Sequence, residues 1–312
     1  MVMILVLQSS LFVAVLLWLS LQRPSDKVWA GFAIGAAGLA LVGVGLAGLW
    51  VYPPRWALAP GGLVYAMVSY CVWRRSDYAN ARGALRRAVL IGGSLTWTIL
   101  GGALVWQSVA GHIRPRGETY DLAAPLLGEG YCVISGGASA LLNFHMETLA
   151  AGKEAYRGQS YGVDFIARSP LGFRTIDDWW WRAAPDDPRS YRIFGAPVVA
   201  PCAGEVMTAR DGLPDQPAGV IVLRPMAGNH VILSCGDHEV LLAHLRQDSV
   251  SVAQGQAVEI GDRLGEVGNT GASDEPHLHV SVQRAAVGAA PLGGPPVHLS
   301  FSGRFLARGD CL

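Results

Sequence analysis

The sequence predicts two parts of different fold class. These are an N-terminal all-α bundle of four transmembrane helices and a C-terminal all-β domain with an antiparallel, barrel- or sandwich-like sheet. Of the 312 residues, 51% are hydrophobic, and the excess lies in four apolar runs within the first third of the chain. From about residue 128 the pattern changes to short strand-like segments between turns rich in Gly, Asp and Asn. We therefore expect a four-helix region at 1–110, a linker at 111–127 and the β domain at 128–312.

Each apolar run has about the 17–25 residues that a helix needs to cross a bilayer. None contains Asp, Glu, Lys or Arg, and the runs are 3–21, 28–52, 57–73 and 88–110. The third is the weakest, because Pro60, Gly61 and Gly62 interrupt it. The first lacks a positively charged start and a small-residue cleavage site, so we expect a retained span and not a signal peptide.

The loop at 74–87 predicts the orientation in the membrane. Its sequence, RRSDYANARGALRR, carries five arginines against one aspartate, which favours the cytoplasmic side. Arg114 and Arg116 follow the fourth run and oppose this orientation, but they are fewer. We expect a multi-pass protein of the cytoplasmic (inner) membrane, with the C-terminal domain outside the cytoplasm.

Charge and composition exclude two function classes. The net charge is zero, so there is no electrostatic case for binding nucleic acid. The apolar runs hold no acidic, basic or histidine side chain, so a transport or proton path would have no ionisable carrier. We expect the runs to anchor the protein in the lipid bilayer, or to contact a partner helix through the glycine-rich stretch 31–48.

Four cysteines fall in the outer domain: Cys132, Cys202, Cys235 and Cys311. An oxidising compartment favours one or two disulfides, and free buried thiols are the alternative. Four cysteines allow three pairings, and the sequence does not choose among them. We favour Cys202–Cys235, because both fall on strand-like segments.

Eight segments of the outer domain have the pattern of strands. They are 195–201, 204–210, 219–224, 229–234, 239–245, 256–260, 263–267 and 277–282. Helical periodicity is poor except around 139–156. The stretch 174–194 is predicted to be a surface insertion, with the tryptophans at 179–181 half buried under their own loop.

A group of polar residues in this domain could form a catalytic site. His277 and His279 lie two apart in PHLHV, so on a strand both point to one face, where they could bind a metal or transfer protons. The alternative is a solvated strand face. Asp164 lies between apolar neighbours, and His244 is flanked by leucines, where a buried imidazole needs a partner. His145 ends the string NFH.

These residue types suit metal-assisted hydrolysis. A catalytic zinc takes three protein ligands and leaves a fourth position for water. Further histidines can take a proton and stabilise an oxyanion near neutral pH. Of the other histidines, His230 could line the cleft or be structural, His238 is expected to be solvated in its turn, and His112 and His298 are expected to be incidental.

Several spaced segments together resemble one family. SYGVDF, GAPVVAPCAGEV, GNHVILSCGDHEVLLAHL and GQAVEIGDRLGEVGNTGASDEPHLHVSV follow, in order, the pattern of the lysostaphin-type (LytM-like) zinc metallopeptidases. These are β-sheet enzymes, mostly cell-wall endopeptidases. The resemblance covers about residues 128–285 and not the apolar runs. By position it implies Asp164 and His279 as zinc ligands, with His244 and His277 as catalytic histidines that do not bind the metal.

The first ligand departs from the family's common motif, HxGxD. Ser160 stands where that histidine would be. One branch of the family has an NxH segment upstream and a QxYAxD-like string, and SGGASALLNFH with GQSYGVDF resembles that branch. The resemblance therefore implies His145 as the first ligand, which requires the intervening segment to fold back.

Two functions follow as hypotheses. The first is a membrane-anchored metalloendopeptidase with one Zn²⁺ per chain, hydrolysing peptide amide bonds outside the membrane; peptidoglycan cross-link or stem peptides are the substrate class that the resemblance implies. The alternative is a catalytically inactive cell-wall-binding or scaffold/regulatory domain, which Ser160 favours. The rhythm of 199–267 also resembles biotinyl or lipoyl carrier domains, but no lysine follows Lys153 to be modified.

Overall fold

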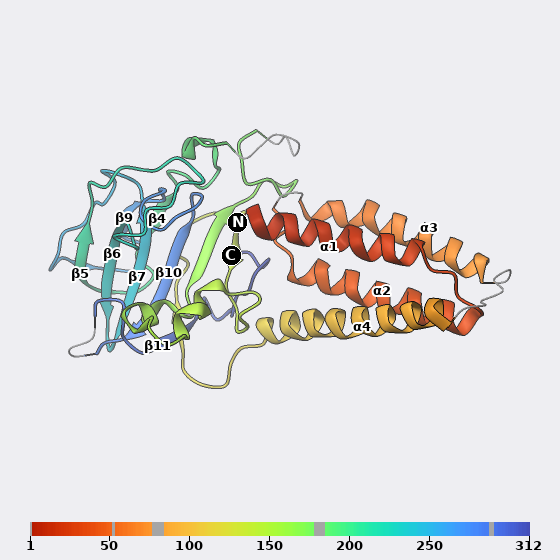
Figure 1. Ribbon diagram of the computed structural model, residues 1–312. Coiled ribbons are helices and arrows are strands. Elements are labelled where there is room, and N and C mark those ends of the chain that lie inside the picture. The colour runs from red at the N-terminus through yellow and green to blue at the C-terminus, as the bar shows by residue number, and fades with distance from the viewer. Residues whose placement is uncertain (1, 52–53, 77–83, 178–184, 287–289) are drawn as a thin grey trace. The chain divides into compact units, whose positions relative to one another are not determined.

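The computed structural model describes residues 2–51, 54–76, 84–177, 185–286 and 290–312. It divides into two compact units, Met1–Ala110 and Gly111–Leu312. The first is helical and the second is a β half-barrel (Figure 1). Each unit is described separately below.

Each of the four apolar runs forms a helix in the described part of the first unit: α1 (Val2–Ser20), α2 (Lys27–Ala47), α3 (Leu58–Arg75) and α4 (Ala84–His112). Three stretches are long and apolar enough to cross a membrane: Lys27–Ala47, Arg55–Arg75 and Arg87–His112. The apolar stretch found in the described part of α1 is shorter, Val6–Ser20.

Local sequence explains where α2 and α3 begin. Asp26 caps α2 by accepting a hydrogen bond from the Trp29 N–H at 3.1 Å. Pro60 lies in the first turn of α3, where a missing N–H costs nothing, so the helix continues through the expected interruption. Glycine lets α2 and α4 approach closely: a Cβ at Gly101 would collide with the backbone of Ala40.

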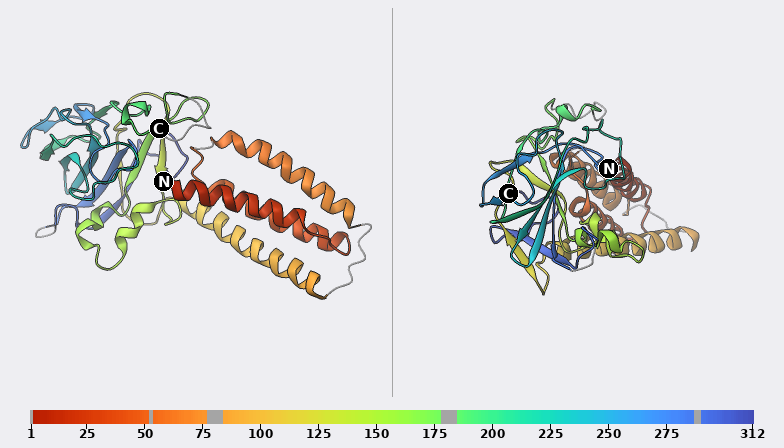
Figure 2. Two further views of the ribbon diagram at one scale, coloured as in Figure 1. Left: turned by 45° about the horizontal axis from the view of Figure 1, so that its top comes forward. Right: turned by 90° about the vertical axis from the view of Figure 1, so that its left-hand side faces the viewer.

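Within the described residues, the β unit contains a nine-stranded sheet and a two-stranded sheet (Figures 1 and 2). The main path runs β1-β11-β10-β7-β6-β5-β8, β3 also pairs with β10, and β2 pairs with β3. The bounds are β1 (Thr119–Leu122), β2 (Tyr131–Ser135), β3 (Val163–Ala167), β4 (Pro197–Val199), β5 (Gly204–Arg210), β6 (Asn229–Cys235), β7 (His238–Leu245), β8 (Ala257–Val258), β9 (Arg263–Glu266), β10 (Leu278–Arg284) and β11 (Pro296–Phe301).

Seven of the eight expected strand segments contain a strand, and the expected strand at 219–224 is wrong. Pro217 and Pro225 flank this segment and cannot donate to a ladder. Its backbone bonds instead to a loop, since Val222 N donates to the carbonyl of Gly271 at 3.1 Å. Pairing is antiparallel throughout the described strands except between β1 and β11, which are parallel.

The segment expected to be a linker contains β1, which adds to the large sheet beside β11. Ahead of it, Glu118 accepts two hydrogen bonds from Arg284 at 2.7 and 2.8 Å. Residues 118–122 therefore pack as part of the β unit. The region of weak helical periodicity forms two short 3₁₀ helices, η2 (Phe144–Leu149) and η3 (Glu154–Gln159).

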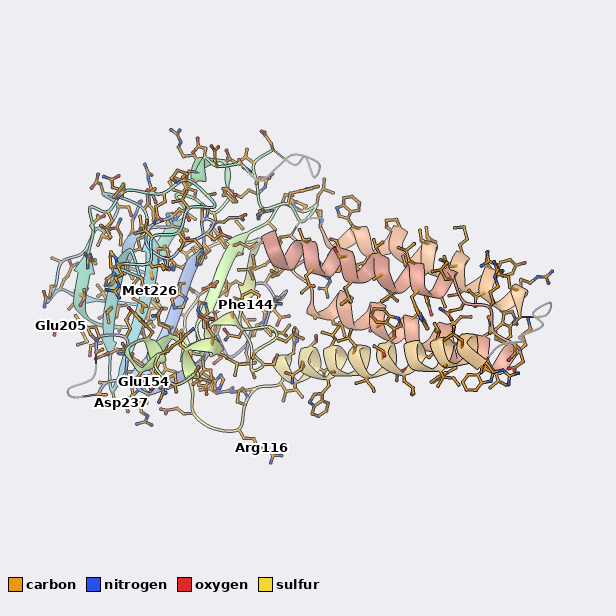
Figure 3. The ribbon with its side chains drawn as sticks, viewed as in Figure 1. Arg116, Phe144, Glu154, Glu205, Met226 and Asp237 are labelled. Carbon is orange, nitrogen blue, oxygen red and sulfur yellow. A yellow bond between two sulfur atoms is a disulfide. The ribbon has the colours of Figure 1, made fainter. Side chains whose placement is uncertain are left out.

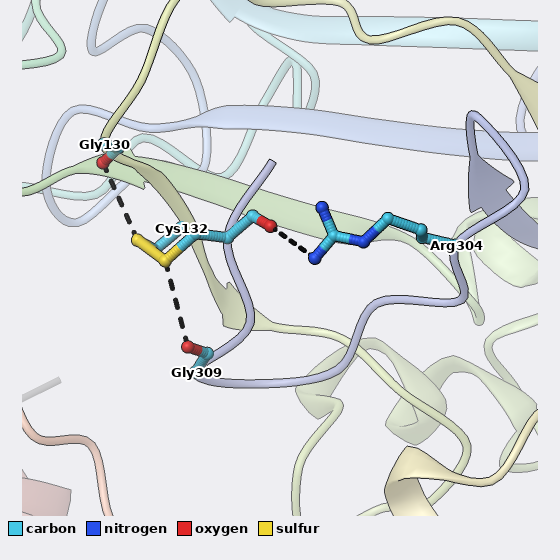
Figure 4. Close-up of a disulfide and its surroundings, with 5 residues drawn as sticks. Gly130, Cys132, Arg304 and Gly309 are labelled. Carbon is cyan, nitrogen blue, oxygen red and sulfur yellow. Dashed lines mark hydrogen bonds between the residues drawn. A yellow bond between two sulfur atoms is a disulfide. The ribbon is translucent and has the colours of Figure 1, made fainter.

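Two disulfides close the β unit. The favoured pairing Cys202–Cys235 is confirmed, and Cys132 pairs with Cys311 across 179 residues. Figure 4 shows the second bridge, where Arg304 donates to the carbonyl of Cys311 at 2.9 Å. One core cluster, which includes the fully buried Phe165 and Leu242, lies beneath the strands that carry the polar site.

Candidate metal centre

Strand pairing places Asp164 and His279 side by side. Asp164 on β3 lies directly opposite His279 on β10, and side chains of directly paired residues share one face of a sheet. Nδ1 of His279 is 2.8 Å from Oδ1 of Asp164. Both side chains are buried, so their polar atoms must find partners within the site.

His145 reaches the same carboxylate from a separate segment. Its Nε2 lies 2.9 Å from Oδ2 of Asp164. Ligand atoms of His145, Asp164 and His279 all lie within 4.8 Å of one another. The fold-back that the resemblance requires is therefore present.

Buried hydrogen bonds explain how the 143–160 segment folds back. Asn143 accepts a hydrogen bond from the His145 N–H, and its amide donates to the carbonyl of Gly162 at 3.1 Å. Thr148 Oγ1 donates to the carbonyl of His145 at 2.8 Å and lies 2.7 Å from Ser160 Oγ. Phe144, labelled in Figure 3, opens η2 beside His145.

His244 and His277 complete the cluster. Their ring centroids are 4.7 Å apart, and Nε2 of His277 is 3.9 Å from Oδ1 of Asp164. Nδ1 of His244 lies 2.8 Å from the carbonyl of Thr270, and Nδ1 of His277 lies 2.7 Å from that of Glu275. A carbonyl oxygen can only accept, so we assign a proton to Nδ1 in both rings. In its neutral form each ring then has an unprotonated Nε2.

The backbone at His244 is unusual. His244 has φ 65°, a left-handed backbone conformation that residues other than glycine rarely adopt. Its N–H donates to the carbonyl of Ala227, and its carbonyl accepts from the N–H of Gly268 at 2.9 Å. Such strain persists only where surrounding bonds fix it, and it is concentrated at functional sites.

Burial and neighbouring charges set the protonation states. Burial opposes ionisation of Asp164, but His145 and His277 beside it outweigh burial and hold the pKa of Asp164 well below its usual value. Burial lowers the pKa of His279 to about 4, and burial with His277 nearby holds the pKa of His244 well below its usual value. Burial also acts to lower the pKa of His145, yet the charge of Asp164 raises it overall. The carboxylate of Asp164 is thus ionised, and the imidazoles of His244 and His279 are neutral.

The residues fit a zinc ion. Two imidazoles and one carboxylate are a donor set that zinc accepts, and three ligands leave one position open for catalysis. Within the described residues, Nε2 of His279 is buried and has no hydrogen-bond partner. Gly162 makes room for this ring, because a Cβ there would collide with Cε1 of His279.

Other expectations about histidines turn out differently. The expectation that His238 is solvated is wrong: the side chain is buried, with its Nε2 2.9 Å from Oε1 of Glu118. His298 stacks on Tyr161 with centroids 3.6 Å apart, and burial lowers its pKa to about 4. His230 is half buried, with Nδ1 2.8 Å from the carbonyl of Gly228. The tryptophans at 179–181 lie outside the described residues.

Sequence reasoning missed two residues that support the site, Arg174 and Glu275. They form a buried ion pair next to His277, with Arg174 Nε 2.6 Å from Glu275 Oε2. Glu275 lies only two residues before His277, which was a usable signal. Arg174 is distant in sequence and gave none.

Residues 191–291 match the model of Peptidase family M23. The peptidoglycan DD-endopeptidase ShyA of Vibrio cholerae serotype O1 is 34% identical over 114 residues, covering 33% of this chain and 25% of ShyA. This chain therefore matches about a quarter of the length of that curated relative.

Two solved structures are similar at lower identity. A zinc-containing peptidase from Vibrio cholerae is 20% identical, with 54% of this chain and 36% of that chain covered and a TM-score of 0.27. The catalytic domain of lysostaphin from Staphylococcus simulans is 21% identical, with 51% and 81% covered and a TM-score of 0.27.

The half-barrel sheet and its His–Asp–His group define the class of the β unit as a zinc metallopeptidase domain. More specifically, the chain carries a domain of Peptidase family M23.

Proposed function

We propose that this chain is a membrane-anchored zinc metalloendopeptidase that hydrolyses peptide amide bonds outside the cytoplasmic membrane, with peptidoglycan cross-link or stem peptides as substrate. One observation carries the proposal. Donor atoms of His145, Asp164 and His279 converge within 4.8 Å, although His145 comes from a segment outside the matched region 191–291. A binding module would need no such three-donor group.

In this proposal His145, Asp164 and His279 hold the zinc, and His244 and His277 do the proton chemistry. When bound, zinc would supply an activated water and polarise the scissile carbonyl. Burial keeps His244 neutral, so its Nε2 can accept a hydrogen bond from the attacking water and orient it. Nε2 of His277, 3.9 Å from Oδ1 of Asp164, would take a proton from that water and pass it to the leaving amine.

Three features support a membrane anchor and an extracytoplasmic β unit. Three helical stretches are apolar enough to span a bilayer. Helices α3 and α4 expose large apolar side chains, among them Leu63 (74%) and Ile99 (71%), as lipid-facing helices do. Both disulfides lie in the β unit, and disulfides persist in oxidising compartments. The arginine-rich loop 74–87 adds the orientation, although Arg82 lies outside the described residues.

The similarity to ShyA, named a peptidoglycan DD-endopeptidase, supports peptidoglycan peptides as the substrate class. The alternative of an inactive wall-binding domain depended on Ser160 leaving the site with two ligands. It loses that support because His145 supplies a third donor beside Asp164.

Zinc content of the full-length protein in detergent tests the proposal. We expect about one zinc per chain in the wild type and loss of zinc in His145→Ala and His279→Ala. His230→Ala is the matched control, because it removes a half-buried imidazole outside the donor group. Cleavage of cross-linked muropeptides, followed by mass spectrometry, should disappear in the same two variants.

Two outcomes would change the proposal. Zinc lost only from His279→Ala would move the first ligand away from His145. A folded wild type that binds no zinc would favour the inactive binding domain.

A further inference from the structure

A buried ion pair lies beside the turn that leads into His277. Arg174 Nε and NH2 donate to the two carboxylate oxygens of Glu275 at 2.6 and 2.9 Å, a bidentate arrangement. The side chains are 6% and 13% exposed. A buried pair of this kind usually adds little net stability, because desolvation offsets the attraction. Its position therefore calls for a reason other than stability of the fold.

The Arg174 end of the pair is fixed by its surroundings. Its guanidinium lies 5.7 Å from the centre of the Tyr191 ring, and that tyrosine is only 2% exposed. The Tyr191 hydroxyl donates to the carbonyl of Pro185 at 3.0 Å. The Arg174 carbonyl accepts from the Arg192 N–H at 2.9 Å. The cation is thus anchored on a segment remote in sequence from the turn.

The Glu275 end acts directly on His277. The carboxylate of Glu275 binds Arg174, while its own carbonyl oxygen lies 2.7 Å from Nδ1 of His277. Ser273 Oγ lies 3.0 Å from that same carbonyl and 2.7 Å from Oδ1 of Asn269, so its one proton can go to either oxygen. Rotation of residue 275 would move the acceptor that holds the His277 ring.

We propose that Arg174 and Glu275 are positioning residues, whose ion pair locks the 273–277 turn so that the Glu275 carbonyl keeps the proton of His277 on Nδ1 and Nε2 faces Asp164. Nε2 is then the unprotonated nitrogen that the peptidase mechanism needs, 3.9 Å from Asp164 Oδ1. Neither residue touches zinc or substrate in this assignment. The inference deepens the proposed function and rests on it for the role of His277, but not for the tautomer.

The test uses full-length, detergent-solubilised protein with Arg174→Met, Arg174→Lys and Glu275→Gln. We expect zinc content to stay at the wild-type level and KM to stay within about twofold, while kcat falls by about ten- to a hundredfold, since small misplacement of a catalytic group has that effect. The kcat of Arg174→Lys should fall less than that of Arg174→Met, because lysine keeps the positive charge but lacks the bidentate guanidinium. Arg284→Gln is the matched control, as it breaks another bidentate Arg–Glu pair at the opposite end of β10.

A second readout does not depend on catalysis. In protein labelled with ¹⁵N-histidine, the His277 signals, identified by their loss in His277→Gln, should report a proton on Nδ1 in the wild type and a mixture of tautomers in Arg174→Met. The double variant Arg174→Leu/Glu275→Leu separates the effect of the ion pair on the position of His277 from its effect on the stability of the fold. It should be more thermally stable than the single variants, since apolar side chains can replace a buried ion pair. Its kcat should stay as low as theirs.

Each contrary result has a distinct meaning. Wild-type kcat in folded, zinc-loaded Arg174→Met and Glu275→Gln would overturn the inference. So would a rise in KM alone, which would make Arg174 a substrate contact, and so would an unchanged His277 tautomer. If the wild type bound no zinc and cleaved nothing, the proposed function would fail, and the tautomer measurement would still decide the role of the ion pair.

Discussion

Ser160 stands four residues before Asp164, where the common lysostaphin-type motif has a histidine. Its side chain is fully buried, and its hydroxyl donates to the carbonyl of Arg157 at 2.6 Å. The same oxygen lies 2.7 Å from Thr148, whose hydroxyl donates to the carbonyl of His145. The residue that replaces the usual ligand therefore helps to hold the segment that supplies the ligand from elsewhere.

Gly162 offers a sharp test of the metal centre at this scale. Gly162→Ala should lower zinc affinity by about tenfold or more while the chain stays folded, because the added Cβ would push the His279 ring away from Asp164. Zinc affinity can be measured by competition with a chromogenic chelator.

Gly265→Ala is the control for that variant. Its Cβ would make ordinary contacts, the nearest being Leu245 Cδ1 at 3.4 Å. Equal zinc affinity in Gly162→Ala and the wild type would falsify the assignment of His279 as a ligand held by this close contact.

At the scale of elements, the C-terminal segment after β11 supports the ligand-bearing loop. Arg308 donates to the carbonyls of Ile134 and Leu142 at 3.1 and 2.9 Å, and its guanidinium lies 4.4 Å from the centre of the Phe144 ring. The Cys132–Cys311 disulfide, drawn in Figure 4, ties this segment to β2. The disulfide therefore holds in place the segment that packs against the residue before His145.

We expect the double variant Cys132→Ser/Cys311→Ser to lose stability by about 2–5 kcal/mol, because a bridge across a long loop restricts the unfolded chain. It should also lose zinc affinity, since Arg308 would no longer be held against Phe144. Thermal unfolding and chelator competition would measure the two effects. Cys202→Ser/Cys235→Ser, across 33 residues, should lower stability without weakening zinc binding at temperatures where the protein is folded. Equal zinc affinity in both double variants would contradict this account.

For the whole molecule, the arginine-rich loop and the disulfides predict one orientation. In a Cys71→Ser background, Leu127→Cys should react with a membrane-impermeant maleimide added to intact spheroplasts, because the proposed orientation places the β unit, with residue 127, outside the membrane. Leu85→Cys should react only after permeabilisation. The two leucines are 65% and 78% exposed, so either introduced thiol would be reactive if reached. The reverse labelling pattern would place the β unit in the cytoplasm.

Local pattern in the sequence determined much of this protein. Apolar length predicts the four helices, because a helix satisfies its own backbone and needs no distant partner. Short segments between turns predict eight strands, and seven of these segments contain one. The types and spacing of residues single out Asp164, His277 and His279 before any contact is known. The family resemblance supplies His145.

Tertiary structure alone decided what depends on pairing between distant segments. The 219–224 segment has strand-like residues, but its backbone bonds to the 271–274 loop. β1 joins the large sheet because it pairs with β11. The buried His238 finds its polar partner in Glu118, 120 residues away. Arg174 meets Glu275 across 101 residues. Such contacts follow from how the whole chain packs, so neither periodicity nor spacing within a short window could fix them.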